Sequence, residues 1–189
     1  MSYKIPDFRC EEIKKIVTRT FIKLGIHDLP INAFQIAEKL GVKIVPYSSK
    51  SEKTRLLMTS LSEDGFSIKY DGIWYIFYND LMNDGRINNT IAHECGHIIL
   101  DHSQESDLAE AEANFFAKYA LAPPVLIHGL NLKSASEIYM HFDISREAAR
   151  YAYDYYRKRV TYGPPYLLDY EISLLKQFGL DALRGGDEI

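Results

Sequence analysis

The chain has 189 residues, 47% of them hydrophobic and 25% charged, which is the balance of a globular protein with a buried core and excludes a largely disordered one. Its net charge is −4 and its basic residues form no stripe, so the composition argues against direct binding of nucleic acid. No stretch approaches the roughly 18 apolar residues of a membrane span, and the first residues lack the apolar core of a signal peptide. Two cysteines are too few for a disulfide framework, so we expect a cytoplasmic protein with no membrane contact.

The first forty residues have the pattern of two helices. Residues 9–24 carry apolar side chains at helical spacing, and Gly25 ends the run. A second helix is expected over 31–40, because Pro30 precedes it and Gly41 follows it.

Residues 42–79 have the composition of a small sheet. The residues Asp71-Gly72 between two apolar runs are typical of a hairpin turn. We expect a mostly antiparallel sheet, in which the last run is either an edge strand that could pair with an extended peptide or an internal strand. Its expected strands are short and rich in β-branched, aromatic and other apolar residues, at 42–47, 55–61, 66–70 and 73–79.

The rest of the chain has a helical pattern. Strands followed by helices indicate an α+β fold, which we divide into a main domain, 1–160, and a helical appendage, 161–189. The cations Arg157-Lys158-Arg159 close one helix, where they suit the negative end of its dipole. The expected helices cover 84–101, 107–122, 133–142, 145–160 and about 166–178.

The segment 89–100 contains the pattern H-E-x-x-H, formed by His93, Glu94 and His97. Positions i and i+4 of a helix lie on one face, so the two imidazoles can aim at one point, and neutral imidazole is a good zinc ligand. Glu94 is rotated about 100° from His93, which lets it reach a water beside the metal. The surrounding residues are strongly apolar, so this helix should be buried, where such side chains need partners. A pair of hydrogen-bonded core histidines is the alternative interpretation.

A catalytic zinc ion usually takes three protein ligands and leaves a fourth position to water. We favour Glu110 as the third ligand, because Asn114 follows it by one helical turn and could fix a ligand histidine by a hydrogen bond. Glu112 is the alternative ligand. It lies about 200° around the helix from Glu110, so the two carboxylates cannot both face the same metal ion. With Glu110 as the ligand, Glu112 would be a solvated or structural carboxylate. His102 is one position out of the metzincin register and lacks the glycine of that pattern.

Three segments together resemble the ImmA/IrrE family of metallo-endopeptidases. They are IAHECGHIILDH, the block EAEANFFA followed closely by residues 121–123, and the upstream run FQIAEKLGVKIV. The resemblance covers roughly residues 9–155. H-E-x-x-H is shared by many zincins, whereas the block E-x-E-A-N-x-F-A is much more specific.

The resemblance implies a zincin-like fold, with the strand 73–79 beside the active helix and zinc bound by His93, His97 and Glu110. Related gluzincins carry E-x-x-A-D, and matching that pattern to residues 110–114 selects Glu110 again. Members typically cleave a helix-turn-helix repressor that acts on mobile elements, in phages or in stress responses. Only about 30 residues precede FQIAEKLGV, too few for a DNA-binding domain, so a repressor substrate would be a separate protein.

The expected activity is therefore zinc-dependent hydrolysis of a peptide bond, with Glu94 as the general base. Candidates for an oxyanion donor are Tyr119, His128, His141 and the tyrosines of 151–156, by residue type alone. Two alternatives share the same ligands: a zinc hydrolase of a small molecule, and a regulatory binding module, such as an antirepressor or toxin–antitoxin partner, with little proteolysis. The presence of Glu94 favours the enzymes, because a metal-only scaffold needs no base.

Overall fold

The computed structural model describes residues 4–104 and 106–180, which form two compact units. Unit 1 contains residues 32–117 together with 4–5, and unit 2 contains residues 6–31 and the chain from 118 onward. The helix α5 (Asp107–Leu121) begins in unit 1 and ends in unit 2. None of the helices in the described part of the chain has the length and apolar character needed to cross a membrane.

Unit 1 is built on a mixed sheet of three strands, β1 (Lys43–Pro46), β2 (Gly65–Tyr70) and β3 (Ile73–Tyr78), in the order β1-β3-β2. The expected hairpin is present, since β2 pairs antiparallel with β3 and Asp71 and Gly72 have positive φ angles. The expectation of a mostly antiparallel sheet is wrong for the other pair, because β1 runs parallel to β3. β3 lies between its neighbours, so it is not the edge strand that we considered.

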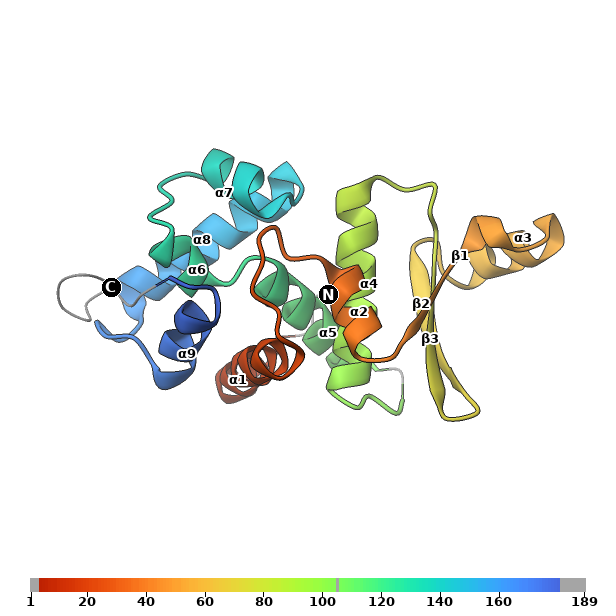
Figure 1. Cartoon of the computed structure of the whole chain (residues 1–189), viewed down its shortest axis with the longest axis horizontal. Helices are drawn as coiled ribbons and strands as arrows, with labels where there is room; N and C mark the ends of the chain where they lie inside the picture. The colour runs from red at the N-terminus through yellow and green to blue at the C-terminus, as the bar shows by residue number, and fades with distance from the viewer. Residues whose placement is uncertain (1–3, 105, 181–189) are drawn as a thin grey trace. The chain divides into compact units, whose positions relative to one another are not determined.

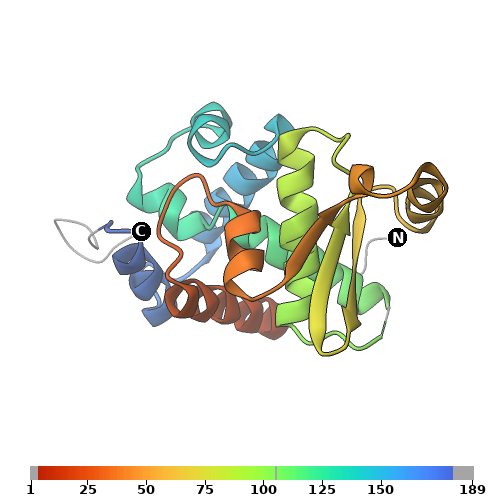
Figure 2. The same ribbon diagram turned by 45° about the vertical axis from the view of Figure 1, so that its right-hand side comes forward.

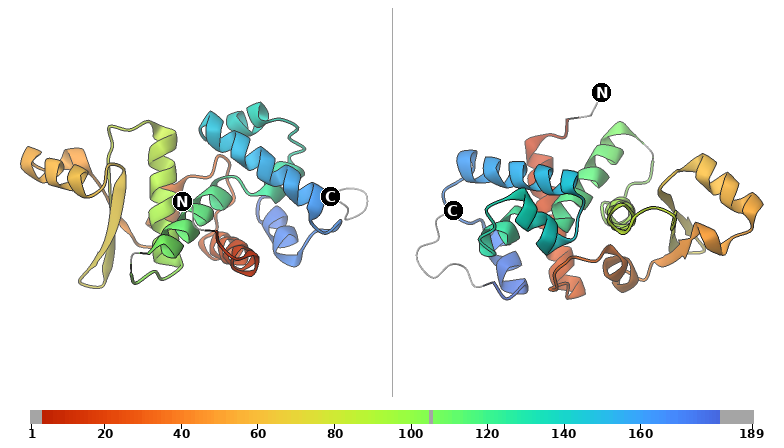
Figure 3. Two further views of the ribbon diagram at one scale, coloured as in Figure 1. Left: turned by 180° about the vertical axis from the view of Figure 1, so that it is seen from behind. Right: turned by 90° about the horizontal axis from the view of Figure 1, so that it is seen from above.

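Residues 55–61 are helical rather than a strand and belong to α3 (Glu52–Leu61), which follows the short 3-10 helix η1 (Tyr47–Ser49). The Ser51 side chain caps α3 by accepting from the Thr54 amide, and Leu and Met are good helix formers. The run therefore had a helix start signal that its apolar composition concealed. α3 lies beyond the sheet on the side away from α4, as Figures 1 and 3 show.

The opposite face of the sheet is covered by α4 (Asp84–Ile99), with α2 (Ala33–Lys39) beside it (Figure 2). Asn83 caps α4 by accepting from the Arg86 amide. A core of fully buried side chains lies in this unit and includes Ile36, Ile76, Ile91, Ala92 and Cys95. The sheet packed on the H-E-x-x-H helix confirms the expected α+β, zincin-like fold.

Unit 2 is helical. It contains α1 (Asp7–Leu24), α6 (Pro124–Gly129), α7 (Ala135–Phe142), α8 (Arg146–Tyr162) and α9 (Asp169–Gln177). The helices α1 and α9 lie side by side although they are far apart in the sequence (Figures 2 and 3). The helix α6 is not among the expected helices. Pro124 stands in its first turn, which tolerates proline.

The expected division at residue 160 stays a prediction. Within the segment 161–189, α9 packs against α1 and α6 in unit 2. Residues 181–189 of that segment lie outside the described residues.

Candidate metal centre and catalytic groove

Two histidines of α4 direct their rings to one point. His93 and His97 stand four residues apart on the helix, and their Nε2 atoms are 3.0 Å apart. Burial, followed by the neighbouring His93, lowers the pKa of the His97 imidazole to about 4. The ring is therefore neutral near pH 7, which is the form that can bind a metal ion.

The carboxylate of Glu110, on α5, lies beside these two rings. Its carboxylate oxygens lie 3.1 Å from the Nε2 atom of His97 and 3.4 Å from that of His93. Gly96 allows α5 to come this close, because a Cβ atom there would lie 3.1 Å from the Phe116 ring and 3.2 Å from the Cα atom of Ala113. The glycine between the two histidines of the motif was therefore a signal for helix packing that our sequence analysis did not use.

The spacing of these three donors fits a tetrahedral metal ion. Bonds of roughly 2.0–2.1 Å at tetrahedral angles separate the ligand atoms by about 3.3 Å. The donor atoms of His93, His97 and Glu110 are separated by 3.0, 3.1 and 3.4 Å. The three residues form a group that could hold a metal ion, and the donor set of two imidazoles and one carboxylate is common for catalytic zinc.

Glu94 lies next to this group and is almost fully buried. The hydroxyl of Ser67, on β2, donates a hydrogen bond of 2.7 Å to its Oε2 atom. Burial raises the pKa of the Glu94 carboxyl, while the Ser67 hydroxyl and His93 act in the opposite direction. A carboxylate with a raised pKa beside a metal site suits proton transfer. Ser67 was missed in the sequence, since only the pairing of β2 brings it to α4.

These side chains line an open groove of about 900 Å³ in unit 1. The lining comes from the end of α3, from β2 and β3, from α4 and α5, and from residues 102–104 and 106 between those two helices. Its volume lies within the range of about 300–1,000 Å³ that ligand pockets commonly have. Its lining includes Leu61, Ser67, Trp74, Asn89, His93, Glu94, His97, His102, Glu110 and Asn114.

His102 and Glu112, the other residues considered as third ligand, lie on the Nδ1 side of the His97 ring. Its Nδ1 atom is 3.0 Å from the Nδ1 atom of His102, and the Nε2 atom of His102 is 3.1 Å from the carboxylate of Glu112. Glu112 is buried. Of the two roles expected for Glu112, solvated or structural, the buried pairing contradicts the solvated one.

Asn114 does not make the contact that we expected. Its amide donates to the backbone carbonyl of Glu110 at 2.8 Å, a bond that polar side chains commonly form one turn along a helix. It lines the groove, but no bond to a ligand histidine is present among the described residues. One of the two reasons for expecting Glu110, a hydrogen bond from Asn114 to a ligand histidine, is therefore absent from the described contacts, whereas the match to E-x-x-A-D does not depend on it.

The oxyanion candidates chosen by residue type lie elsewhere. Tyr119 and His128 belong to unit 2, where the Tyr119 side chain is buried and His128 pairs with the Tyr156 hydroxyl at 3.1 Å. The His141 ring contacts the carbonyl of Glu137 on its own helix. None of them is among the residues that line the groove as far as the structure describes it.

A comparison with protein families decides the relationship. The family model described as Peptidase_M78, IrrE N-terminal-like domain, matches residues 37–154, which is more than half of the chain. The chain belongs to the peptidase M78 family. This confirms the ImmA/IrrE resemblance and makes the chain a member of a metallopeptidase family, for which a metal ion and a protein substrate are implied. A comparison of this M78 chain with curated proteins found no match.

Proposed function

We propose that this M78 chain is a zinc-dependent endopeptidase that hydrolyses a peptide bond in a protein substrate. One observation carries the proposal: three donor atoms, on His93, His97 and Glu110, lie 3.0–3.4 Å apart in an open groove beside the buried carboxylate of Glu94. In this proposal the first three residues hold the zinc ion, and Glu94 is the general base.

When bound, zinc would polarise the scissile carbonyl and acidify the attacking water. Glu94 removes a proton from that water as its oxygen bonds to the carbonyl carbon. The same carboxyl then delivers this proton to the amine nitrogen as the carbon–nitrogen bond breaks, so the base is regenerated. Ser67 holds the Oε2 atom of Glu94 by a bond of 2.7 Å, which fixes the orientation of the carboxylate toward the groove.

The free edge of β2 supports a peptide as the substrate. β2 has one sheet neighbour among the described residues, and its residues Gly65, Phe66 and Ser67 line the groove. An extended chain can add to such an edge through main-chain hydrogen bonds. The proposed substrate therefore lies along β2, in place of the strand 73–79 that we first considered.

A helix-turn-helix repressor cut in trans is the proposed substrate, with a role in transcription regulation on mobile elements. This part of the proposal rests on the family alone. Cys10 and Cys95 are both free, which agrees with the reducing cytoplasm where a repressor would be met.

The decisive experiment measures metal content and peptidase activity together. We expect about one zinc ion per chain in the wild type, loss of the ion in His93→Ala, and full retention in Glu94→Gln. Activity should fall by about 10²–10⁴-fold in Glu94→Gln, because the positioned base is removed. Glu38→Gln changes an exposed carboxylate on α2 and serves as the matched control. Unchanged activity in Glu94→Gln would refute the mechanism.

A separate experiment tests the substrate. The protein is co-expressed with a helix-turn-helix repressor whose gene neighbours its own. Wild type should produce a cut repressor under inducing conditions, whereas Glu94→Gln should leave it intact. A repressor that stays whole but is released from its operator by both forms would favour the regulatory binding module.

A further inference from the structure

A chain of three side chains runs from the proposed metal position into the interior of unit 1. The Nε2 atom of His97 faces Glu110 at 3.1 Å, and its Nδ1 atom faces the Nδ1 atom of His102 at 3.0 Å. On the other side of its ring, the Nε2 atom of His102 lies 3.1 Å from Glu112. We name His97, His102 and Glu112 the ligand relay.

The backbone at the end of α4 brings the second ring into place. Asp101 has a φ angle of 55°, and the amide of His102 bonds back to the carbonyl of His97 at 3.0 Å. This turn sets the rings of His97 and His102 edge to face, with centroids 5.0 Å apart. The second histidine is thus held against the first by the helix terminus itself.

The polar contacts of the ligand relay are consistent with one assignment of protons. A neutral imidazole has one N–H donor and one acceptor nitrogen. If the Nε2 atom of His97 keeps its lone pair for a metal ion, its proton is on Nδ1 and donates to the Nδ1 atom of His102. The proton of His102 is then on Nε2, where it donates to the carboxylate of Glu112. Each contact has one donor and one acceptor, which is how tautomers are assigned.

Burial strengthens these contacts. The side chains of His102 and Glu112 are 11% and 6% exposed, and hydrogen bonds to a charged group gain strength in a poorly solvated site. A buried carboxylate next to an imidazole N–H fixes the tautomer of that ring and increases the electron density on the atoms beyond it. The contacts of Glu112 therefore act on His97 through His102.

We propose that His102 and Glu112 are positioning residues that hold His97 as the Nδ1–H tautomer, and thereby raise the affinity of the site for a divalent metal ion. The inference rests on the proposed function, since it concerns the same site. His102 binds no metal itself in this arrangement, because both of its ring nitrogens are engaged by His97 and Glu112.

The test measures the dissociation constant of Zn²⁺ by competition with a chromophoric chelator. His102→Phe keeps an aromatic ring but removes the acceptor for the His97 proton, and we expect about 10–100-fold weaker binding. His102→Asn places an amide oxygen near the original Nδ1 position, so it should restore most of the affinity. His141→Phe, on a histidine of unit 2, is the matched control and should bind as the wild type does.

A second readout separates positioning from a structural role. In ¹⁵N spectra of metal-free protein, His97 should be the Nδ1–H tautomer in the wild type and His102→Asn, and a mixture of tautomers in His102→Phe. Glu112→Gln, which keeps its size, should weaken Zn²⁺ binding by up to about tenfold and tests the ligand relay if His102→Phe does not fold. A structural role would change the thermal midpoint but leave the zinc constant of the folded protein unchanged.

The possible failures are distinguishable. If the wild type binds no Zn²⁺, the proposed function fails. If the wild type binds Zn²⁺ and both His102→Phe and Glu112→Gln bind it equally well, the ligand relay is overturned while the proposed peptidase stands.

Discussion

Two clusters of charged side chains differ in how their polar atoms are satisfied. In unit 2, Arg159 and Glu171 form a buried pair, with bonds of 3.0 and 2.8 Å between the guanidinium and the two carboxylate oxygens. The third guanidinium nitrogen donates to the carbonyl of Pro164 at 2.7 Å, and the Leu168 amide donates to Glu171 at 2.9 Å. In this cluster donors meet acceptors within the protein.

The cluster in unit 1 gathers side-chain atoms of a kind that can bind a metal ion. Ring nitrogens of His93 and His97 and the carboxylate of Glu110 lie within 3.4 Å of one another, and no Lys or Arg is among the residues that line their groove in the described chain. The difference shows that burial and charge alone do not identify a binding site. Convergent nitrogen and carboxylate atoms with no Lys or Arg beside them are a stronger indication, because a metal ion could satisfy all of them.

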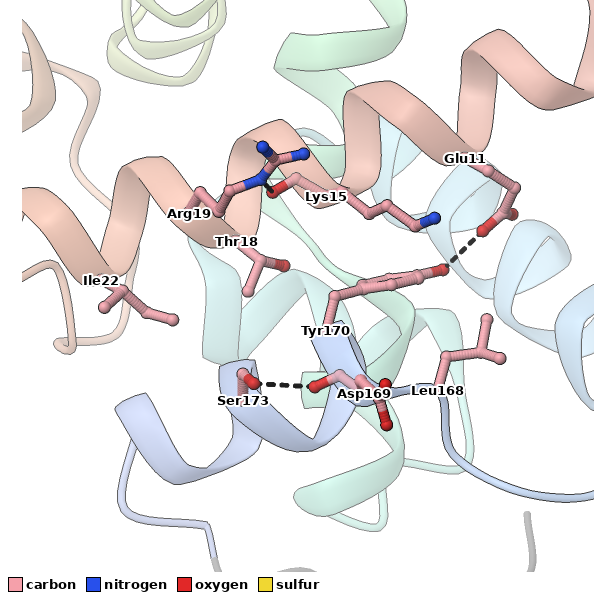
Figure 4. Close-up of a pocket in the computed structure, with 9 residues that line it drawn as sticks. All are labelled: Glu11, Lys15, Thr18, Arg19, Ile22, Leu168, Asp169, Tyr170 and Ser173. Carbon is pink, nitrogen blue, oxygen red and sulfur yellow. Dashed lines mark hydrogen bonds between the residues drawn. The ribbon is translucent and has the colours of Figure 1, made fainter.

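The pocket between α1 and α9, of about 410 Å³, makes the same point (Figure 4). The Tyr170 hydroxyl donates to Glu11 at 2.9 Å, and the Ser173 hydroxyl donates to the carbonyl of Asp169 at 2.7 Å. Several of its polar groups therefore pair as donor and acceptor, and no group of three His, Cys, Asp or Glu side chains that could hold a metal ion lies there among the described residues.

The largest expected effect is on the cluster of unit 2. Arg159→Met leaves the Glu171 carboxylate without its cation, and breaking a buried pair in this way costs about 3–5 kcal/mol of the free energy of unfolding. The double variant Arg159→Met/Glu171→Leu should recover much of this loss, since it also removes the stranded charge. Urea denaturation measures both variants. A double variant no more stable than Arg159→Met would contradict the comparison.

The second effect concerns Glu110 in unit 1. Without metal, the free energy of unfolding of Glu110→Ala should lie within about 0.5 kcal/mol of that of the wild type, because a half-exposed side chain away from the core contributes little. Zinc at 100 times its dissociation constant should stabilise the wild type by about 2.7 kcal/mol and the variant not at all. Calorimetry with and without zinc measures the difference. Equal stabilisation of both proteins would remove Glu110 from the ligand set.

A smaller effect is expected at Gly65 on β2. A Cβ atom there would lie 2.7 Å from the carbonyl oxygen of Phe77 and 2.8 Å from the Thr90 side chain. Gly65→Ala should therefore cost about 1–3 kcal/mol through overpacking. Gly41→Ala, whose Cβ would meet nothing within 4 Å, is a control for glycine replacement, although its positive φ angle adds strain of its own. Unchanged unfolding of Gly65→Ala would show that β2 can shift freely from α4.

The smallest expected effect is a change in pH dependence. The Ser67 hydroxyl stabilises the ionised form of Glu94 and so lowers a pKa that burial raises. Ser67→Ala removes the lowering contribution, so the pKa rises further, and the base becomes ionised only at higher pH. The acid limb of kcat/KM against pH should therefore move to higher pH, with little change on the plateau. If the acid limb of the Ser67→Ala profile stays in place or moves to lower pH, Ser67 does not control the ionisation of Glu94.

The sequence predicted the parts of this molecule that depend on local spacing. The residues of H-E-x-x-H were on a helix as expected, and Asp71-Gly72 formed the expected hairpin. Glu110 lies beside both histidines, although the reason given for it, a bond from Asn114, is absent from the described contacts.

What the sequence did not predict depends on contacts between distant segments. The parallel pairing of β1 with β3 has no local signal, and neither does the bond from Ser67 to Glu94. Arg159 was interpreted only as a cation at a helix end, because its partner Glu171 is twelve residues further along, in another helix. Local patterns predict the proposed ligands, whereas contacts between distant segments determine which residues those side chains contact.

Gly96 has no side chain, and this lets α5 lie close to α4. A methyl group there would meet the Phe116 ring and the Ala113 backbone at 3.1–3.2 Å, so α5 would have to withdraw by a few tenths of an ångström. The carboxylate of Glu110 would move with it and the donor triangle would widen. In the proposed metal site, Gly96 would therefore limit the radius of the bound ion, and Gly96→Ala should shift the preference of the site toward larger divalent cations.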